Sequence, residues 1–202
     1  MSEFTLTFEG FDKALEFYGQ KFEGQLIEAT RIAINDTARW SISERGIIRR
    51  DMQDNINFPS GYINKDRLNV SKFASDNSLE AQIYARGEPT SLARFAVDAG
   101  AKAGIMVHVK TKGGAKMIPK GFLYGGLKRG DVRKGNSGLV VRSESKPKGG
   151  YRPKQIGSTN LWLLYGPSIY QVFANSMHRL NPAILDKLTD NFDRQVARLV
   201  KP

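Results

Sequence analysis

The chain has 202 residues, of which 40% are hydrophobic and 25% charged. This balance supports a buried core and excludes a wholly disordered protein. Cysteine is absent, which excludes disulfides, thiolate chemistry and cysteine-held zinc or iron–sulfur sites. The length corresponds to one domain, and we expect that domain to span residues 1–202.

The first quarter of the chain is dominated by helical periodicity. Residues 1–10 alternate apolar and polar side chains, which predicts a strand. From about Phe11 into the low fifties, the pattern predicts a long helix with a wide apolar face. Residues 55–61 are rich in Asn, Pro and Gly and predict the end of this helix. Four apolar residues recur every seven positions on the helix: Leu26, Ala33, Trp40 and Ile47.

Several strands are predicted for the middle of the chain, at residues 79–86, 105–110, 117–124, 139–142 and 158–165. Gly and basic residues are abundant in residues 125–138, and a second Gly/Pro/Lys stretch covers residues 145–154. We therefore expect residues 110–157 to form a basic extended β-arm or loop inserted in the domain. Its tip around Gly125–Gly138 is expected to be disordered in the free subunit.

The last third of the chain is predicted to be helical again. One helical segment covers Pro167–Arg179, and a second begins at Asn181 as the N-cap with Pro182 in the first position. A run of strands flanked by helices is typical of α+β proteins. We predict an α+β fold in which the long N-terminal helix and the C-terminal helix pack on one mostly antiparallel sheet.

The positive charge is concentrated in one segment. Residues 1–109 hold 13 Lys and Arg against 15 Asp and Glu, and residues 155–202 hold 5 against 3. Residues 110–154 hold 13 against 2, which equals the whole net charge of +11. A solvated basic loop is one interpretation; contact with nucleic-acid phosphate or an acidic protein is the other. The basic residues are Lys110, Lys112, Lys116, Lys120, Lys128, Arg129, Arg133, Lys134, Arg142, Lys146, Lys148, Arg152 and Lys154.

Aromatic side chains near basic ones are a second indication of nucleic-acid binding, because bases stack on them. Tyr124 and Tyr151 lie within or beside the basic clusters. These two tyrosines are the candidate stacking residues.

Motifs for catalysis are sparse. The loop Gly135-Asn136-Ser137-Gly138 bears a faint likeness to a serine-protease nucleophile loop, and His108 and His178 are the two imidazoles of the chain. Asp51 and Asp54 are expected to form salt bridges or to lie at a helix end. The sequence contains neither a phosphate-cradling glycine motif nor a carboxylate cluster with metal spacing. We predict no enzymatic activity, no catalytic residue, no cofactor and no metal site.

Three short stretches carry a family resemblance. The first is Asp51 followed by Phe58-Pro59-Ser60-Gly61-Tyr62, the second is Ala85-Arg86 with Pro89-Thr90-Ser91-Leu92-Ala93-Arg94-Phe95, and the third is Leu164-Tyr165-Gly166-Pro167-Ser168-Ile169 with Gln171-Val172-Phe173. In this order, with a basic β-rich segment before the third stretch, the chain resembles the minor tail protein Z family of tailed bacteriophages and prophages. The similarity runs from about Ala29 to Leu199. Eight motif residues are expected to be structural: Phe58, Pro59, Gly61, Leu92, Phe95, Tyr165, Gly166 and Pro167.

The resemblance implies a structural virion protein that completes the head-proximal end of a long phage tail and joins it to the neck. By analogy with neighbouring neck proteins, it implies a hexameric ring around the DNA channel, in contact with other tail and neck proteins and with the DNA phosphate backbone. Such a protein is made in the bacterial host cytoplasm, is assembled into the virion and does not contact a membrane. The alternative is a stand-alone nucleic-acid-binding protein without sequence specificity.

Overall fold

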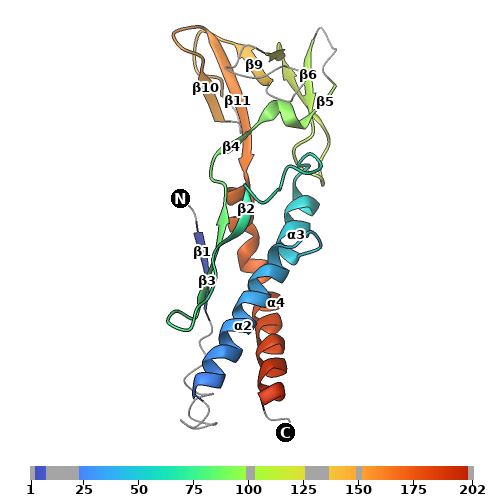
Figure 1. Cartoon of the computed structure of the whole chain (residues 1–202). Coiled ribbons are helices and arrows are strands. Elements are labelled where there is room, and N and C mark those ends of the chain that lie inside the picture. Colours follow the sequence, from blue (N-terminus) through green and yellow to red (C-terminus); the bar gives the residue numbers. More distant parts are fainter. Residues whose placement is uncertain (1–2, 8–22, 99–102, 126–136, 149–151, 200–202) are drawn as a thin grey trace. The chain divides into compact units, whose positions relative to one another are not determined.

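The computed structural model describes residues 3–7, 23–98, 103–125, 137–148 and 152–199. By their contacts, the residues form two compact units. Unit 1 comprises Met1–Met52, Asn64–Gly87 and Phe173–Pro202, and unit 2 comprises Gln53–Ile63 and Glu88–Val172. Helices and antiparallel strands are both present (Figure 1), which confirms the predicted α+β class. The single domain over residues 1–202 stays a prediction.

Unit 1 contains a three-stranded antiparallel sheet in the order β1 (Glu3–Thr7), β3 (Glu80–Ala85), β2 (Leu68–Lys72). Side chains from helix α2 (Glu23–Ile42) and helix α4 (Ile169–Leu199) share one hydrophobic core with this sheet. The core is formed by Leu26, Ala29, Ala33, Ile34, Ala38, Ala74, Ala81, Leu188, Phe192 and Val196. The small residues on α2 bring its backbone near the sheet, which explains why the alanines of the apolar face are buried.

The N-terminal helix differs from the sequence prediction. The part before residue 23 lies outside the described residues. The rest is divided, because α2 ends at Ile42 and α3 (Ile47–Asn55) begins five residues later. A Cβ atom at Gly46 would lie 2.4 Å from the carbonyl oxygen of Ser41, so this tight connection requires glycine. The helix end predicted within residues 55–61 is confirmed at Asn55.

The C-terminal helix also differs from the prediction. The two expected segments form one helix, α4, with Pro182 in its interior, so the start predicted at Asn181-Pro182 is wrong. The helix is capped instead by Ser168, whose Oγ accepts a hydrogen bond of 3.0 Å from the Gln171 amide. Leu180 and Ile184, on either side of the proline, are both buried. Their packing offsets the backbone hydrogen bond that proline cannot donate.

Unit 2 contains two antiparallel sheets. One has the order β10 (Arg152–Gln155), β11 (Leu161–Ser168), β9 (Gly138–Arg142), β8 (Phe122–Tyr124), and β4 (Pro89–Ser91) also pairs with β11. The other has the order β5 (Ala96–Asp98), β6 (Gly104–Val107), β7 (Lys116–Pro119). The short 3₁₀ helix η2 (Leu92–Phe95) joins β4 to β5.

The segment predicted as a basic arm is partly strand. Its described residues contain β7, β8, β9 and β10. The expected single strand at 117–124 is wrong, because a turn at Lys120-Gly121 separates β7 from β8. Lys120 has a φ of 55°, a left-handed conformation that ends the strand. Residues 126–136 of the expected tip lie outside the described residues.

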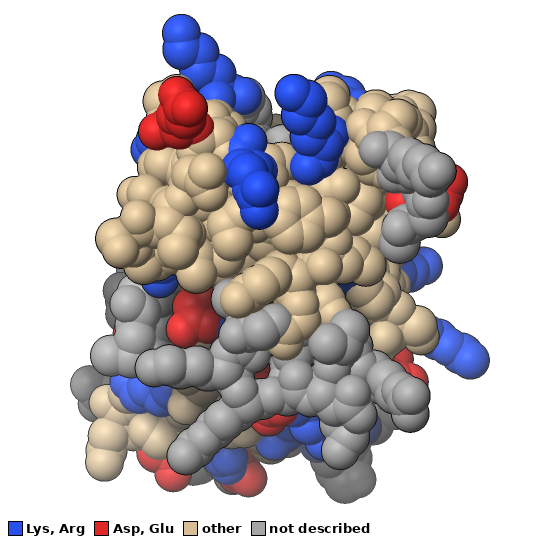
Figure 2. Space-filling view, turned by 90° about the horizontal axis from the view of Figure 1, so that it is seen from above, with Lys and Arg blue, Asp and Glu red and all other residues tan. Residues whose placement is uncertain are grey.

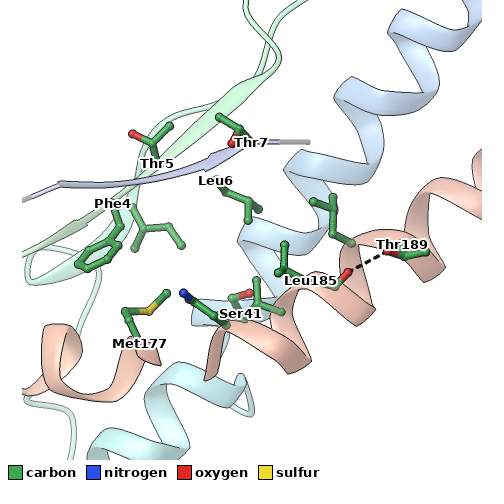
Figure 3. Close-up of a pocket in the computed structure, with 12 residues that line it drawn as sticks. Phe4, Thr5, Leu6, Thr7, Ser41, Met177, Leu185 and Thr189 are labelled. Atoms are coloured by element: carbon green, nitrogen blue, oxygen red, sulfur yellow. Dashed lines mark hydrogen bonds between the residues drawn. The ribbon is translucent and has the colours of Figure 1, made fainter. Parts of the chain in front are cut away.

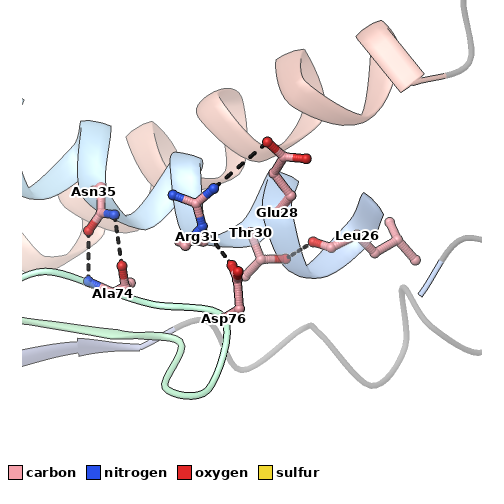
Figure 4. Close-up of polar contacts among 7 residues, drawn as sticks. All are labelled: Leu26, Glu28, Thr30, Arg31, Asn35, Ala74 and Asp76. Carbon is pink, nitrogen blue, oxygen red and sulfur yellow. Dashed lines mark hydrogen bonds and ion pairs between the residues drawn. The ribbon is translucent and has the colours of Figure 1, made fainter. Parts of the chain in front are cut away.

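The connection between β2 and β3 is held against α2 by side-chain hydrogen bonds (Figure 4). Asn35 Nδ2 donates to the Ala74 carbonyl at 3.0 Å, and the Ala74 amide donates to Asn35 Oδ1 at 2.8 Å. Both residues are buried. Nearby, Arg31 Nε donates to Asp76 Oδ1 at 2.7 Å, but the Asp76 side chain is 70% exposed. Buried amide pairing therefore contributes more to this connection than the ion pair does.

We predict that Asn35→Ala lowers the free energy of unfolding by about 1–3 kcal/mol, because it leaves the buried Ala74 amide and carbonyl without partners. The matched variant Arg31→Ala removes the exposed ion pair and should cost less than about 1 kcal/mol. Urea unfolding followed by circular dichroism measures both. Equal losses in the two variants would contradict this assignment.

Candidate interaction surfaces

The described part of the basic segment lies on the surface of unit 2. Its nine cations are all exposed, and none of them forms an ion pair with another described residue. They are Lys110, Lys112, Lys116, Lys120, Arg142, Lys146, Lys148, Arg152 and Lys154. The other four predicted contact residues, Lys128, Arg129, Arg133 and Lys134, lie outside the described residues.

The charge difference between the two units is large. Unit 2 holds 15 Lys and Arg against 5 Asp and Glu, a net charge of +10, whereas unit 1 holds 16 against 15, a net charge of +1. Figure 2 shows Lys and Arg side chains projecting from a largely uncharged surface. Unpaired cations at this density repel one another, so an acidic partner would lower their energy.

Three of the cations share one face of the larger sheet of unit 2. Arg152 lies opposite Tyr165, Lys154 opposite Leu163, and Arg142 opposite Leu161. Alternate residues of β11 point to the same face, and cross-strand partners do so as well. Arg142, Arg152 and Lys154 therefore form a basic group on that face, which we call the sheet cations.

The aromatic residues near the cations are arranged differently from the sequence interpretation. Tyr124 is half-buried on β8 opposite Gly138, and Tyr151 lies outside the described residues. Tyr165, which the sequence marked as structural, stands beside Arg152. Pairing across β10 and β11 brings this arginine and this tyrosine together. Such a pairing cannot be read from residue spacing because β10 was not predicted.

Residues from all three motif stretches pack together in unit 2. The ring of Phe58 stacks on Tyr62 at 5.6 Å and contacts Phe95 at 5.9 Å between centroids. A Cβ atom at Gly166 would lie 3.0 Å from Phe95 Cε2 and 3.7 Å from Leu92 Cδ1. The three stretches, separated by about thirty and seventy residues in the sequence, therefore meet in one place.

Polar and backbone features complete this cluster. Tyr62 Oη donates a hydrogen bond of 3.2 Å to Thr90 Oγ1, and the Arg94 guanidinium lies 5.1 Å from the centre of the Tyr62 ring. Gly61 has a φ of 69°, the left-handed region that favours glycine. The Pro59 carbonyl oxygen accepts a hydrogen bond of 2.9 Å from the Tyr62 amide. These contacts give the motif residues a packing role.

The residues considered for catalysis either contact neighbouring residues or are exposed on the surface. Arg179 Nη2 lies 2.9 Å from Asp51 Oδ2, and the Ser137 carbonyl accepts a hydrogen bond of 3.3 Å from Ser91 Oγ. The His108 amide donates to the Phe95 carbonyl, and the His108 carbonyl accepts from Asn57 Nδ2. His178 is exposed on α4, and Asp54 is exposed at the end of α3. In the described part of the chain, no group of His, Asp and Glu side chains could hold a metal ion.

Unit 1 has an open apolar groove between β1 and α4 (Figure 3). Its volume is about 450 Å³. Phe4 and Leu6 point into it from β1, and Met177 and Leu185 line it from α4. No local sequence pattern predicts this groove, because it forms where a strand and a helix from opposite ends of the chain meet.

No family model, no curated protein and no solved structure matches the chain. Among the described residues, no helix is long and apolar enough to cross a membrane.

We predict that Gly166→Ala lowers the free energy of unfolding by about 1–3 kcal/mol, because the added methyl group overpacks against Phe95. The control Gly114→Ala introduces a Cβ with no atom within 4 Å and should change stability by less than about 0.5 kcal/mol. Thermal unfolding of the two variants distinguishes them. The double variant Gly166→Ala/Phe95→Leu should regain part of the loss; a wild-type stability for Gly166→Ala alone would refute the close packing.

Proposed function

We propose that the chain is a structural virion protein of a long-tailed bacteriophage. It completes the head-proximal end of the tail and joins it to the neck, as a hexameric ring around the DNA channel. The observation that carries the proposal is the convergence of Phe58, Phe95 and Gly166 in one cluster. Residues of a family motif that pack together, rather than surround a cleft with nucleophiles and bases, support an architectural role.

The basic surface supports the placement beside DNA. Phosphate contacts need exposed cations and no particular base sequence. The sheet cations and the lysines of residues 110–120 provide such cations on unit 2. In a ring, they offset the mutual repulsion of phosphates in the channel and stay equally effective as DNA of any sequence passes.

Electron microscopy of lysates tests this function. Disruption of the gene in its parent phage should leave filled heads and tails of finished length that are not joined. A plasmid copy of the gene should restore joined virions. Normal joined virions in the disrupted strain would overturn the proposal.

The alternative function is stand-alone nucleic-acid binding without sequence specificity. The same nine exposed cations favour it. The two functions differ in whether the isolated protein binds DNA tightly at moderate salt. Deleting residues 110–154 is a poor test because it removes β7, β8 and β9 along with the charges; substitution of surface cations leaves the sheets in place.

For the alternative, we predict that replacing the sheet cations by Gln lowers the slope of log affinity against log salt by up to about 3, one phosphate contact for each cation. The control replaces three exposed cations of unit 1, Arg45, Arg50 and Lys65, by Gln and should leave the slope unchanged. Fluorescence anisotropy with a duplex DNA measures both. Equal slopes in wild type and the sheet-cation variant would count against DNA contact through this face.

A further inference from the structure

The groove of unit 1 follows the outer edge of strand β1. Four consecutive residues of this strand line it, namely Phe4, Thr5, Leu6 and Thr7. Successive side chains of a strand point to opposite faces, so four in a row border one hollow only where the hollow runs along the strand's edge. In Figure 3, Phe4 and Leu6 point toward α4, whereas Thr5 and Thr7 point to the other side. The backbone of β1 therefore forms part of the groove wall.

This backbone is paired on one side only. β1 is the first strand in the order β1-β3-β2, and all five of its residues lie opposite residues of β3. In an antiparallel pair, alternate residues direct their N–H and C=O groups away from the partner strand. Among the described residues, none forms a backbone hydrogen bond with that outer edge. Unpaired groups in such a row are a template for a further strand.

The opposite wall of the groove is an apolar part of α4. Leu185 stands at its mouth and is 53% exposed. None of the twelve lining residues is charged. Burial of a charged side chain here would be costly, because no lining side chain could pair with it. The groove therefore suits an uncharged occupant, and its volume of about 450 Å³ is within the range of ligand sites, about 300–1,000 Å³.

We propose that this groove binds an extended segment of a partner protein, which adds a strand to the edge of β1. The backbone of the segment bonds to the outer N–H and C=O groups of β1. Its alternate side chains are apolar and enter the hollow beside Leu185. In this mode of recognition, main-chain hydrogen bonds supply affinity and the pockets for alternate side chains supply specificity. The five residues of β1 span about 17 Å, so about five residues of the partner pair with them.

The unpaired edge of β1 favours a strand over other occupants. A helix or an apolar small molecule would cover the outer N–H and C=O groups and leave them without partners. Nucleic acid would find no cation among the lining residues. An edge strand of a folded second copy would meet α4 where the next strand of its own sheet lies, whereas a segment that belongs to no sheet fits. The site is separate from the basic surface of unit 2 and goes beyond the proposed function.

A displayed library of random nine-residue peptides, selected on the full chain, tests the site. We expect the enriched peptides to be uncharged over about five residues and apolar at every second position. A scan of the strongest peptide with N-methyl groups then identifies the paired amides. Methylation of an amide that faces β1 removes a donor and blocks the approach, so affinity should fall more than about tenfold at alternate positions and change less than about twofold between them. Fluorescence anisotropy measures both.

Variants of the chain place the binding in the groove. Leu185→Asp introduces a charge at the mouth and should weaken peptide binding by more than about tenfold, while its thermal unfolding transition stays in place because the side chain is half exposed. The matched control Phe73→Asp replaces an apolar residue that is 43% exposed and lies outside the groove, and it should bind like wild type. Peptide should also slow the hydrogen exchange of alternate amides of β1.

Four results would overturn the site: a selection that enriches no peptide, enriched peptides with helical spacing of their apolar residues, an N-methyl scan without a period of two, or equal binding by wild type and Leu185→Asp. Two further results assign the groove to another occupant and also refute the proposal. One is slow exchange of every β1 amide in the free chain, which shows an edge already covered. The other is self-association that Leu185→Asp abolishes, which makes a second copy the occupant.

Discussion

The close approach of Gly166 to the ring of Phe95 is the constraint on which much of unit 2 depends. A side chain at residue 166 would occupy space that Phe95 and Leu92 already fill. Phe95 in turn contacts Phe58, whose ring stacks on Tyr62. One missing Cβ atom therefore allows β11, η2 and the segment after α3 to pack together, and the packing density of protein interiors leaves no slack for a larger residue.

The residues that follow Gly166 extend this constraint along the chain. Pairing between β4 and β11 includes Tyr165 and Ser168 and is irregular between them, where Pro167 has no amide to donate. Ser168 then ends the strand and caps α4. Residues 165–168 thus close the sheet, interrupt its hydrogen bonding and lead into α4.

The uneven distribution of charge between the two units is the second constraint on the structure. Unit 2 carries nearly the whole net charge, and its described cations lie in exposed positions instead of in ion pairs. Folding gains little from such charges, because exposed cations without partners repel one another. Unit 1 is close to neutral and has an apolar groove between β1 and α4. Each unit therefore has a surface that a partner would stabilise, basic in unit 2 and apolar in unit 1.

The sequence by itself determined the α+β class, the location of the charge and five of the eleven described strands, namely β1, β3, β6, β9 and β11. Period-two alternation identified β1 and β3, and the strands predicted at residues 105–110 and 139–142 correspond to β6 and β9. The thirteen cations of residues 110–154 could be found by counting. The motif stretches could be recognised as sequence patterns, but not as neighbours, since contacts among Phe58, Phe95 and Gly166 join residues far apart in the chain.

Only the tertiary structure shows where packing overrides the structure that a local sequence pattern predicts. Asn181-Pro182 has the pattern of a helix start, yet α4 continues through it because Leu180 and Ile184 are buried on the two sides. The regular heptad spacing across residues 26–47 hid the connection at Gly46, where backbone contacts demand a residue without Cβ. The register of β10 with β11 placed Arg152 beside Tyr165. The groove of unit 1 likewise forms only because β1 and α4 meet in the folded chain. Strand pairing and burial depend on residues that are far apart in the sequence, so no local pattern encodes them.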